Sequence, residues 1–177
     1  AINRHTIYDF NASDYFPKDY EIVKYSDLYK KNEESTASEL IGKKAPDWIL
    51  ENIEAQPVSL ADCKSKIILI NFTGIGCGAC QAAVPLLKQL KGLFTSEEFE
   101  LIAIESWSRK VSAIRNYANR KELNYTILNA TNEVIKQYQT GGAAPYFFIV
   151  DQERIIRKVI RGYSLSLIHI SEPTRLR

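Results

Sequence analysis

Short apolar runs alternate with stretches in which apolar residues recur at helical spacing. Residues 66–72 and 99–104 are mostly apolar, which is typical of strands buried on both faces of a sheet. From Gly78 to Phe94 the apolar residues recur every three or four positions, which predicts a helix with one apolar face. Residues 110–123 show the same spacing. We therefore expect buried strands linked by amphipathic helices.

Shorter apolar segments on either side of this region predict further strands and one more helix. Thr131 can cap a helix N-terminus, with Glu133 in the first turn. Gly141 and Gly142 then turn the chain towards Pro145. The expected elements are hairpin strands at 48–50 with 57–59 and at 146–150 with 155–160, a strand at 125–128 and a helix at 131–138.

Two cysteines lie where the strand at 66–72 gives way to the helix that starts at Gly78. A helix N-terminus carries unpaired N–H groups and a partial positive charge, and both stabilise a thiolate. We therefore predict that Cys77, at the N-cap, is an exposed nucleophile. Cys80 lies one turn deeper on the same face, where it can attack a mixed disulfide on Cys77. This spacing predicts thiol–disulfide exchange.

Four segments occur in an order that is more specific than an isolated cysteine pair. They are residues 42–48 (GKKAPDW), 57–60 (PVSL), 72–80 followed by Pro85, and 144–150. In this order they resemble the entry segment, second hairpin strand, active-site segment and cis-proline loop of thioredoxin-fold proteins. The closest resemblance is to the bacterial TlpA/ResA-type thiol–disulfide oxidoreductases of the AhpC/TSA–redoxin superfamily, and it covers about residues 41–163.

The resemblance implies an α/β fold, namely a thioredoxin-like three-layer α/β/α sandwich with a mixed central sheet, an N-terminal β-hairpin and an N-terminal extension. It also implies an enzyme in which Cys77 and Cys80 form a redox-active disulfide, whereas Gly76, Ala144 and Pro145 bind the substrate. A cis bond before Pro145 would turn the neighbouring backbone towards an extended substrate. The implied partners are protein thiols or disulfides and an upstream thiol donor, and no cofactor is required.

The resemblance further implies a location in the bacterial cell envelope, either periplasmic or membrane-anchored. A thioredoxin with the same cysteine spacing can equally work in a cytoplasm, so this expectation depends on the resemblance alone. No stretch approaches about 20 uninterrupted apolar residues, so the sequence predicts no membrane-spanning segment.

The active-site segment departs from the family pattern at three positions. Gly76 replaces the usual Trp before the first cysteine, and Ala79 replaces the usual Pro before the second. Asn71 stands where thioredoxin has a buried Asp, so that any base for Cys80 must be water or another group. Because no His lies between the cysteines to stabilise a thiolate further, the sequence favours a reductant or an isomerase over an oxidant.

Three other functions are compatible with parts of the sequence. A peroxiredoxin-type thiol peroxidase shares the fold but requires Pro and Thr where Ile70 and Gly74 precede Cys77. A metal site would need more ligands than two cysteines, and the only histidines are His5 and His169. A binding module with a static disulfide stays open, although closing so short a loop adds little stability.

Three further residues carry chemistry whose role the sequence leaves open. Cys63 could be a regulatory or resolving thiol, but a single cysteine in a turn is expected to be a small packing residue. Glu105 follows a buried strand at the edge where α/β sheets bind ligands, and it could assist Cys80; we expect a solvated carboxylate instead. Trp107 could line a substrate groove or pack against the domain.

Composition and the chain ends complete the domain prediction. The chain has 177 residues, 45% of them apolar, which is enough for one domain with an extension. The net charge of +2, with scattered signs, argues against nucleic-acid binding. We expect a thioredoxin-like domain at 39–166, a non-native tail at 167–177 and an N-terminal extension at 1–38. The extension could bind a partner or substrate, but we expect an arm that packs its aromatic residues on the domain or the tail of an upstream domain.

Overall fold

The computed structural model describes residues 36–108 and 110–163. Nearly all of the expected extension at 1–38, the expected tail at 167–177, and both histidines lie outside these residues. The helical elements are η3 (Thr36–Leu40), η4 (Leu60–Asp62), α2 (Gly78–Gly92), α3 (Val111–Lys121) and α4 (Asn132–Gln137), and the strands are β1 (Ile49–Asn52), β2 (Pro57–Ser59), β3 (Ile67–Thr73), β4 (Phe99–Glu105), β5 (Thr126–Asn129), β6 (Tyr146–Val150) and β7 (Ile156–Arg161).

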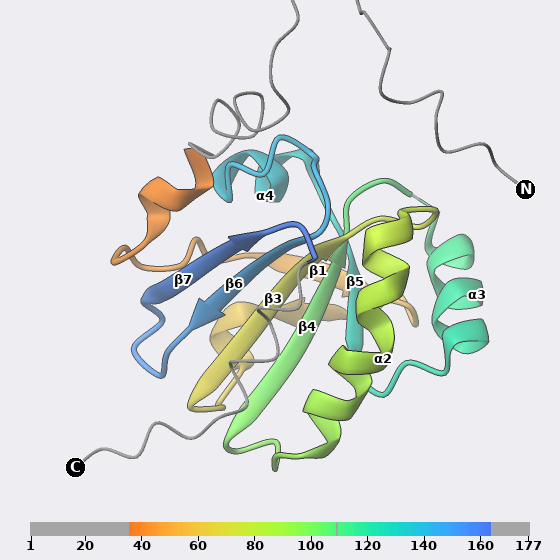
Figure 1. Cartoon of the computed structure of the whole chain (residues 1–177), viewed down its shortest axis with the longest axis horizontal. Coiled ribbons are helices and arrows are strands. Elements are labelled where there is room, and N and C mark those ends of the chain that lie inside the picture. Colours follow the sequence, from red (N-terminus) through yellow and green to blue (C-terminus); the bar gives the residue numbers. More distant parts are fainter. Residues whose placement is uncertain (1–35, 109, 164–177) are drawn as a thin grey trace, which may run out of the picture. The chain divides into compact units, whose positions relative to one another are not determined.

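The strands form one mixed sheet in the order β2-β1-β5-β4-β3-β6-β7 (Figure 1). Central β3 pairs parallel to β4 and antiparallel to β6, and β4 pairs parallel to β5. The hairpins β1–β2 and β6–β7 lie at the two edges of the sheet. Each strand overlaps the segment from which it was predicted, and the central strands are almost fully buried, as their apolar runs indicate.

Helices cover both faces of this sheet. On one face, Leu69 of β3 packs with Ala83 and Leu87 of α2, and α3 contributes a neighbouring cluster. On the other face, the core includes Tyr138 beside α4 and Ala37 of η3. These three layers confirm the predicted α/β/α sandwich with a mixed sheet. Within the described ranges, every helix is too short or too polar to cross a membrane.

Helix ends follow the local sequence signals. Thr131 caps α4, because its hydroxyl oxygen accepts a hydrogen bond from the Val134 N–H at 3.2 Å. α3 ends at Lys121, and Glu122 adopts a left-handed conformation with φ of 49°. The junction between β3 and α2 places Cys77 at the N-cap, as the sequence predicts.

Candidate active site

Cys77 and Cys80 form a disulfide at the start of α2, with their Cα atoms 5.2 Å apart. Cys77 Sγ also accepts a hydrogen bond from the Cys80 N–H at 3.1 Å. This N–H is one of the unpaired donors of the first helical turn, and it would stabilise a thiolate on Cys77 after reduction.

A tight turn leads the chain from β3 into this helix. The Cys77 N–H donates to the Gly74 carbonyl oxygen at 3.0 Å, closing the turn. Gly76 has φ of 93°, a conformation that strongly favours glycine. This backbone gives a physical reason for glycine at the position where the family usually has Trp. A Cβ added to Gly76 would meet no atom within 4 Å, so the space beside Cys77 is open.

The loop before β6 covers the sulfur of Cys77. The Ala144–Pro145 peptide bond is cis, as predicted, and the Ala144 carbonyl oxygen lies 3.7 Å from Cys77 Sγ. Cys77 is therefore only 7% exposed and Cys80 only 2%. The prediction that Cys77 is exposed is wrong for the disulfide form, because this carbonyl occupies the space over the sulfur.

Glu105, at the end of β4, is fully buried, so the prediction of a solvated carboxylate is wrong. Its Oε1 atom accepts three backbone hydrogen bonds, from Ile75 at 3.1 Å, Trp107 at 3.0 Å and Ser108 at 2.8 Å. Ile75 belongs to the turn that carries Cys77. The carboxyl group therefore joins the active-site turn to the loop after β4.

Trp107 lies against the same turn and remains 49% exposed. A Cβ added to Gly74 would come within 2.4–2.8 Å of the Trp107 ring, so the indole lies directly on this glycine. The indole N–H donates to the Gly142 carbonyl oxygen at 2.8 Å. Trp107 therefore links the active-site turn to the loop that leads to Pro145. Periodicity gives no signal for this contact between loops.

Cys63 lies apart from this pair. It follows η4 and packs against the core on the sheet face that η3 and α4 cover. This position confirms the packing role expected from the sequence. Burial, followed by the negative charge of Glu100, raises the pKa of the Cys63 thiol. In the described residues, no three His, Cys, Asp or Glu side chains gather in a group that could hold a metal ion.

Comparisons with known proteins agree with this geometry. The family model described as "AhpC/TSA family" matches residues 41–159. The thiol-disulfide oxidoreductase ResA of Bacillus cereus (strain ZK / E33L) is 25% identical over 122 residues, which cover 68% of this chain and 69% of that protein. ResA of Bacillus subtilis (strain 168) is 25% identical over 129 residues, 72% of each chain.

Solved structures share the fold. StoA from Bacillus subtilis superposes with a TM-score of 0.60 at 16% identity, covering 72% of this chain and 98% of that chain. A thiol:disulfide interchange protein from Bacteroides sp. has a TM-score of 0.60 at 20% identity, covering 67% and 80%. The chain therefore belongs to the AhpC/TSA family, and it is a thioredoxin-like thiol–disulfide oxidoreductase of the TlpA/ResA type.

Proposed function

We propose that this oxidoreductase exchanges disulfides with protein substrates through Cys77 as the attacking thiol and Cys80 as the resolving thiol. The observation that carries the proposal is the N–H···S hydrogen bond from Cys80 to Cys77 at the N-cap of the 15-residue helix α2. This bond and the helix dipole stabilise negative charge on Cys77 rather than on Cys80. Cys80 is the more deeply buried of the two, which suits attack from within the protein.

The exchange needs only the two cysteines and the substrate disulfide. The Cys77 thiolate attacks one substrate sulfur, the substrate S–S bond breaks, and the released sulfur takes up a proton. The Cys80 thiol then loses its proton and attacks Cys77 Sγ. This second step releases the other substrate thiol and forms the Cys77–Cys80 disulfide, so that two electrons pass to the substrate.

The proposed substrate platform consists of Gly76, Ala144 and Pro145. The Ala144 carbonyl beside Cys77 Sγ supports this assignment, because an extended substrate strand could donate a backbone hydrogen bond to it. Such a strand would displace the carbonyl from the sulfur as it binds. The open space at Gly76 would admit the substrate residue that carries the attacked sulfur.

We further propose that the enzyme acts as a reductant supplied by an upstream thiol donor, in the bacterial cell envelope. The absence of a His between the cysteines favours the reducing direction. Similarity to ResA and StoA favours the location. A Cys80→Ser variant should retain protein substrates as mixed disulfides on Cys77, because the resolving thiol is gone. Proteins retained equally by a Cys77→Ser, Cys80→Ser double variant would contradict the assignment.

The experiment that tests the function is a redox equilibrium of the cysteine pair against glutathione. We expect a reversible two-electron transition that is lost in Cys77→Ser and kept in Cys63→Ser. A potential near about −270 mV would support a reductant, whereas one near about −120 mV would contradict that direction. A chain without any transition would instead be a binding module with a static disulfide.

A further inference from the structure

The sheet face under α2 changes from apolar to polar towards the C-terminal ends of β3 and β4. Leu69 and Leu101 lie in the apolar cluster with Ala83 and Leu87 of α2. Because side chains alternate along a strand, the residues two and four positions further on face the same way. The buried polar residues at those positions are Asn71, Thr73 and Glu105.

The cysteine pair lies at this polar end. α2 follows β3 through a tight turn and runs back along it (Figure 1), so its first residues lie near the end of β3. Cys80 comes one turn before Ala83 on the inward side of the helix and is buried. The polar face therefore lies beneath the redox-active residues and not beneath the rest of α2.

Glu105 is the charged member of this face. Three N–H donors on a single oxygen are the arrangement that stabilises a carboxylate. Its other oxygen, Oε2, is buried and has no hydrogen-bond partner among the described residues. Among the described residues, no Lys or Arg forms an ion pair with Glu105. Within residues 36–108 and 110–163, the groups that face a negative charge on Glu105 are therefore backbone N–H dipoles.

The side chain of Tyr117 on α3 lies near enough to Glu105 to be affected by a negative charge there. Burial, and then the negative charge of Glu105, raises the pKa of the Tyr117 hydroxyl on α3. The turn that carries Cys77 is bound to the same carboxylate through the Ile75 N–H. Because Glu105 is hydrogen-bonded to Ile75, two residues before Cys77, a negative charge on Glu105 would act on a thiolate in the same turn.

We propose that Glu105 is a positioning residue that holds the active-site turn and biases the Cys77–Cys80 pair towards the disulfide, which makes the dithiol a stronger reductant. A nearby negative charge disfavours the Cys77 thiolate, whereas the disulfide carries no charge that it could repel. In proteins with a cysteine pair of this type, a more stable dithiol makes the protein a stronger oxidant. Destabilising the dithiol therefore makes it a stronger reductant. The inference rests on the proposed function and deepens it by giving a cause for the reducing direction.

The test is the glutathione equilibrium of Glu105→Gln in a Cys63→Ser background. Gln keeps an oxygen that can accept the three N–H groups but removes the charge. We expect the equilibrium to move about tenfold towards the dithiol, which corresponds to about 30 mV for a two-electron couple. In this reaction, each disulfide that is reduced takes two electrons and two protons from two glutathione thiols, which form glutathione disulfide.

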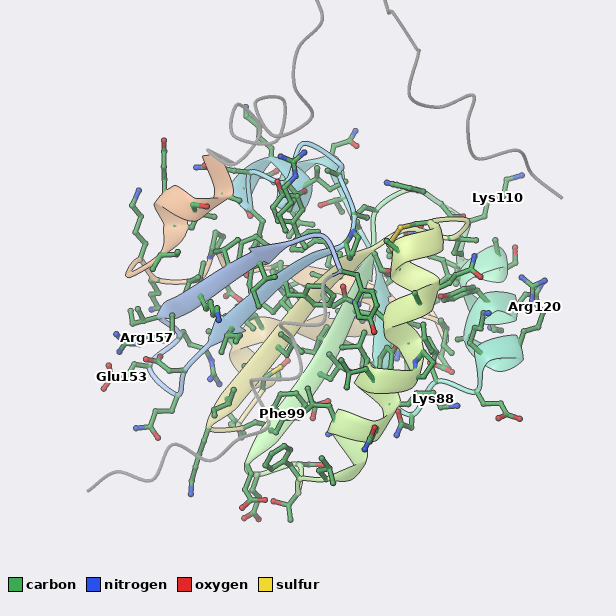
Figure 2. All side chains as sticks on the ribbon, in the orientation of Figure 1. Lys88, Phe99, Lys110, Arg120, Glu153 and Arg157 are labelled. Atoms are coloured by element: carbon green, nitrogen blue, oxygen red, sulfur yellow. A yellow bond between two sulfur atoms is a disulfide. The ribbon has the colours of Figure 1, made fainter. Side chains whose placement is uncertain are left out.

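Glu100→Gln is the matched control, since it removes the same charge from the same strand. Glu100 pairs with Lys91 near the opposite end of β4, which Phe99 marks in Figure 2. We expect this variant to titrate like its parent. An unchanged equilibrium in Glu105→Gln, a shift towards the disulfide, or an equal shift in Glu100→Gln would overturn the inference.

A second measurement on the unsubstituted side chain keeps the inference testable if Glu105→Gln fails to fold. The side-chain carboxyl carbon of Glu105, followed by ¹³C NMR in the reduced protein, should shift as Cys77 ionises. A resonance that does not respond to this ionisation would overturn the inference. A parent protein without any redox transition would contradict the proposed function as well, whereas a normal transition unaffected by Glu105→Gln contradicts the inference alone.

Discussion

Cys77 begins the long helix α2, whereas Cys63 directly follows the short helix η4, and the two sulfurs have opposite surroundings. Cys77 Sγ accepts an N–H bond from the first turn of its helix. The Cys63 thiol instead donates to the Ser59 carbonyl oxygen at 3.7 Å, a bond that favours the protonated form. Burial and Glu100 act in the same direction on Cys63 by raising its pKa.

Exposure would rank Cys63 above Cys77, the thiol that we propose as the attacking one. Cys63 is half-buried, while Cys77 in its disulfide is almost completely buried. A carbonyl oxygen lies 3.7 Å from each sulfur, and what separates the two is the N–H of Cys80, which donates to Cys77 Sγ and has no counterpart among the hydrogen bonds of Cys63 in the described residues. With Cys77 as the proposed attacking thiol, the comparison teaches that the start of a helix, and not access to solvent, selects that thiol.

The largest expected effect is on alkylation of the reduced protein. At pH 7, iodoacetamide should modify Cys77 about tenfold or more faster than Cys63, because thiols at helix N-termini ionise below the ordinary value and Cys63 ionises above it. Mass spectrometry of the digested protein measures both rates. In the oxidised protein only Cys63 should react. Equal alkylation rates of Cys77 and Cys63 in the reduced protein would contradict the claim that the helix N-terminus activates Cys77.

A smaller effect is expected from Gly74→Ala, which disturbs the Cys77 side of the comparison. The added methyl group would overlap the Trp107 ring, so the indole must leave the Gly142 carbonyl. We expect the free energy of unfolding to fall by about 1–3 kcal/mol and the Cys77 alkylation rate to decrease. Denaturant unfolding and the alkylation assay measure these changes.

Gly78→Ala is the matched control for that substitution. Gly78 begins α2 next to Cys77, and a Cβ at this position would meet no atom within 4 Å. The free energy of unfolding should stay within about 1 kcal/mol of the parent value, since Ala is favoured over Gly in a helix. If both alanine variants are equally destabilised, contact with Trp107 is not the cause.

The smallest expected effect is a fall in the free energy of unfolding at alkaline pH, caused by ionisation of Cys63. Its pKa is higher in the folded chain than in the unfolded chain, so the unfolded state loses this proton first as the pH rises. Stability should therefore fall above about pH 8.5, by up to about 1.4 kcal/mol per pH unit. Cys63→Ala should lose this decline, as measured by urea unfolding of the oxidised protein between pH 7.5 and 9.5. A parent protein whose stability is constant over that range would contradict the assignment.

Much of the fold could be predicted because its main signals are local. Apolar runs predict β3 and β4, helical spacing predicts α2 and α3, and Thr131 marks the start of α4. The position of Cys77 at the N-cap follows from the same signals. The cis bond before Pro145 came from the resemblance to a known family, since neither composition nor periodicity distinguishes it from a trans bond.

The parts that could not be predicted depend on contacts between loops. Glu105 ends an apolar strand, where a carboxylate is normally solvated, and its three donors come from two separate loops. The contact of Trp107 with Gly74 likewise joins residues that no periodic pattern relates. The cover over Cys77 depends on a carbonyl 67 residues away in the sequence. Such contacts are set by tertiary structure alone.

The position of Trp107 makes its fluorescence sensitive to the redox state of the cysteine pair. The chain has two tryptophans, and Trp48 is buried in the core, away from solvent changes. Trp107 is half-exposed and touches both the turn that carries Cys77 and the loop that leads to Pro145. Its indole fluorescence should therefore change when the disulfide opens or a substrate displaces that loop, so turnover can be followed without a label.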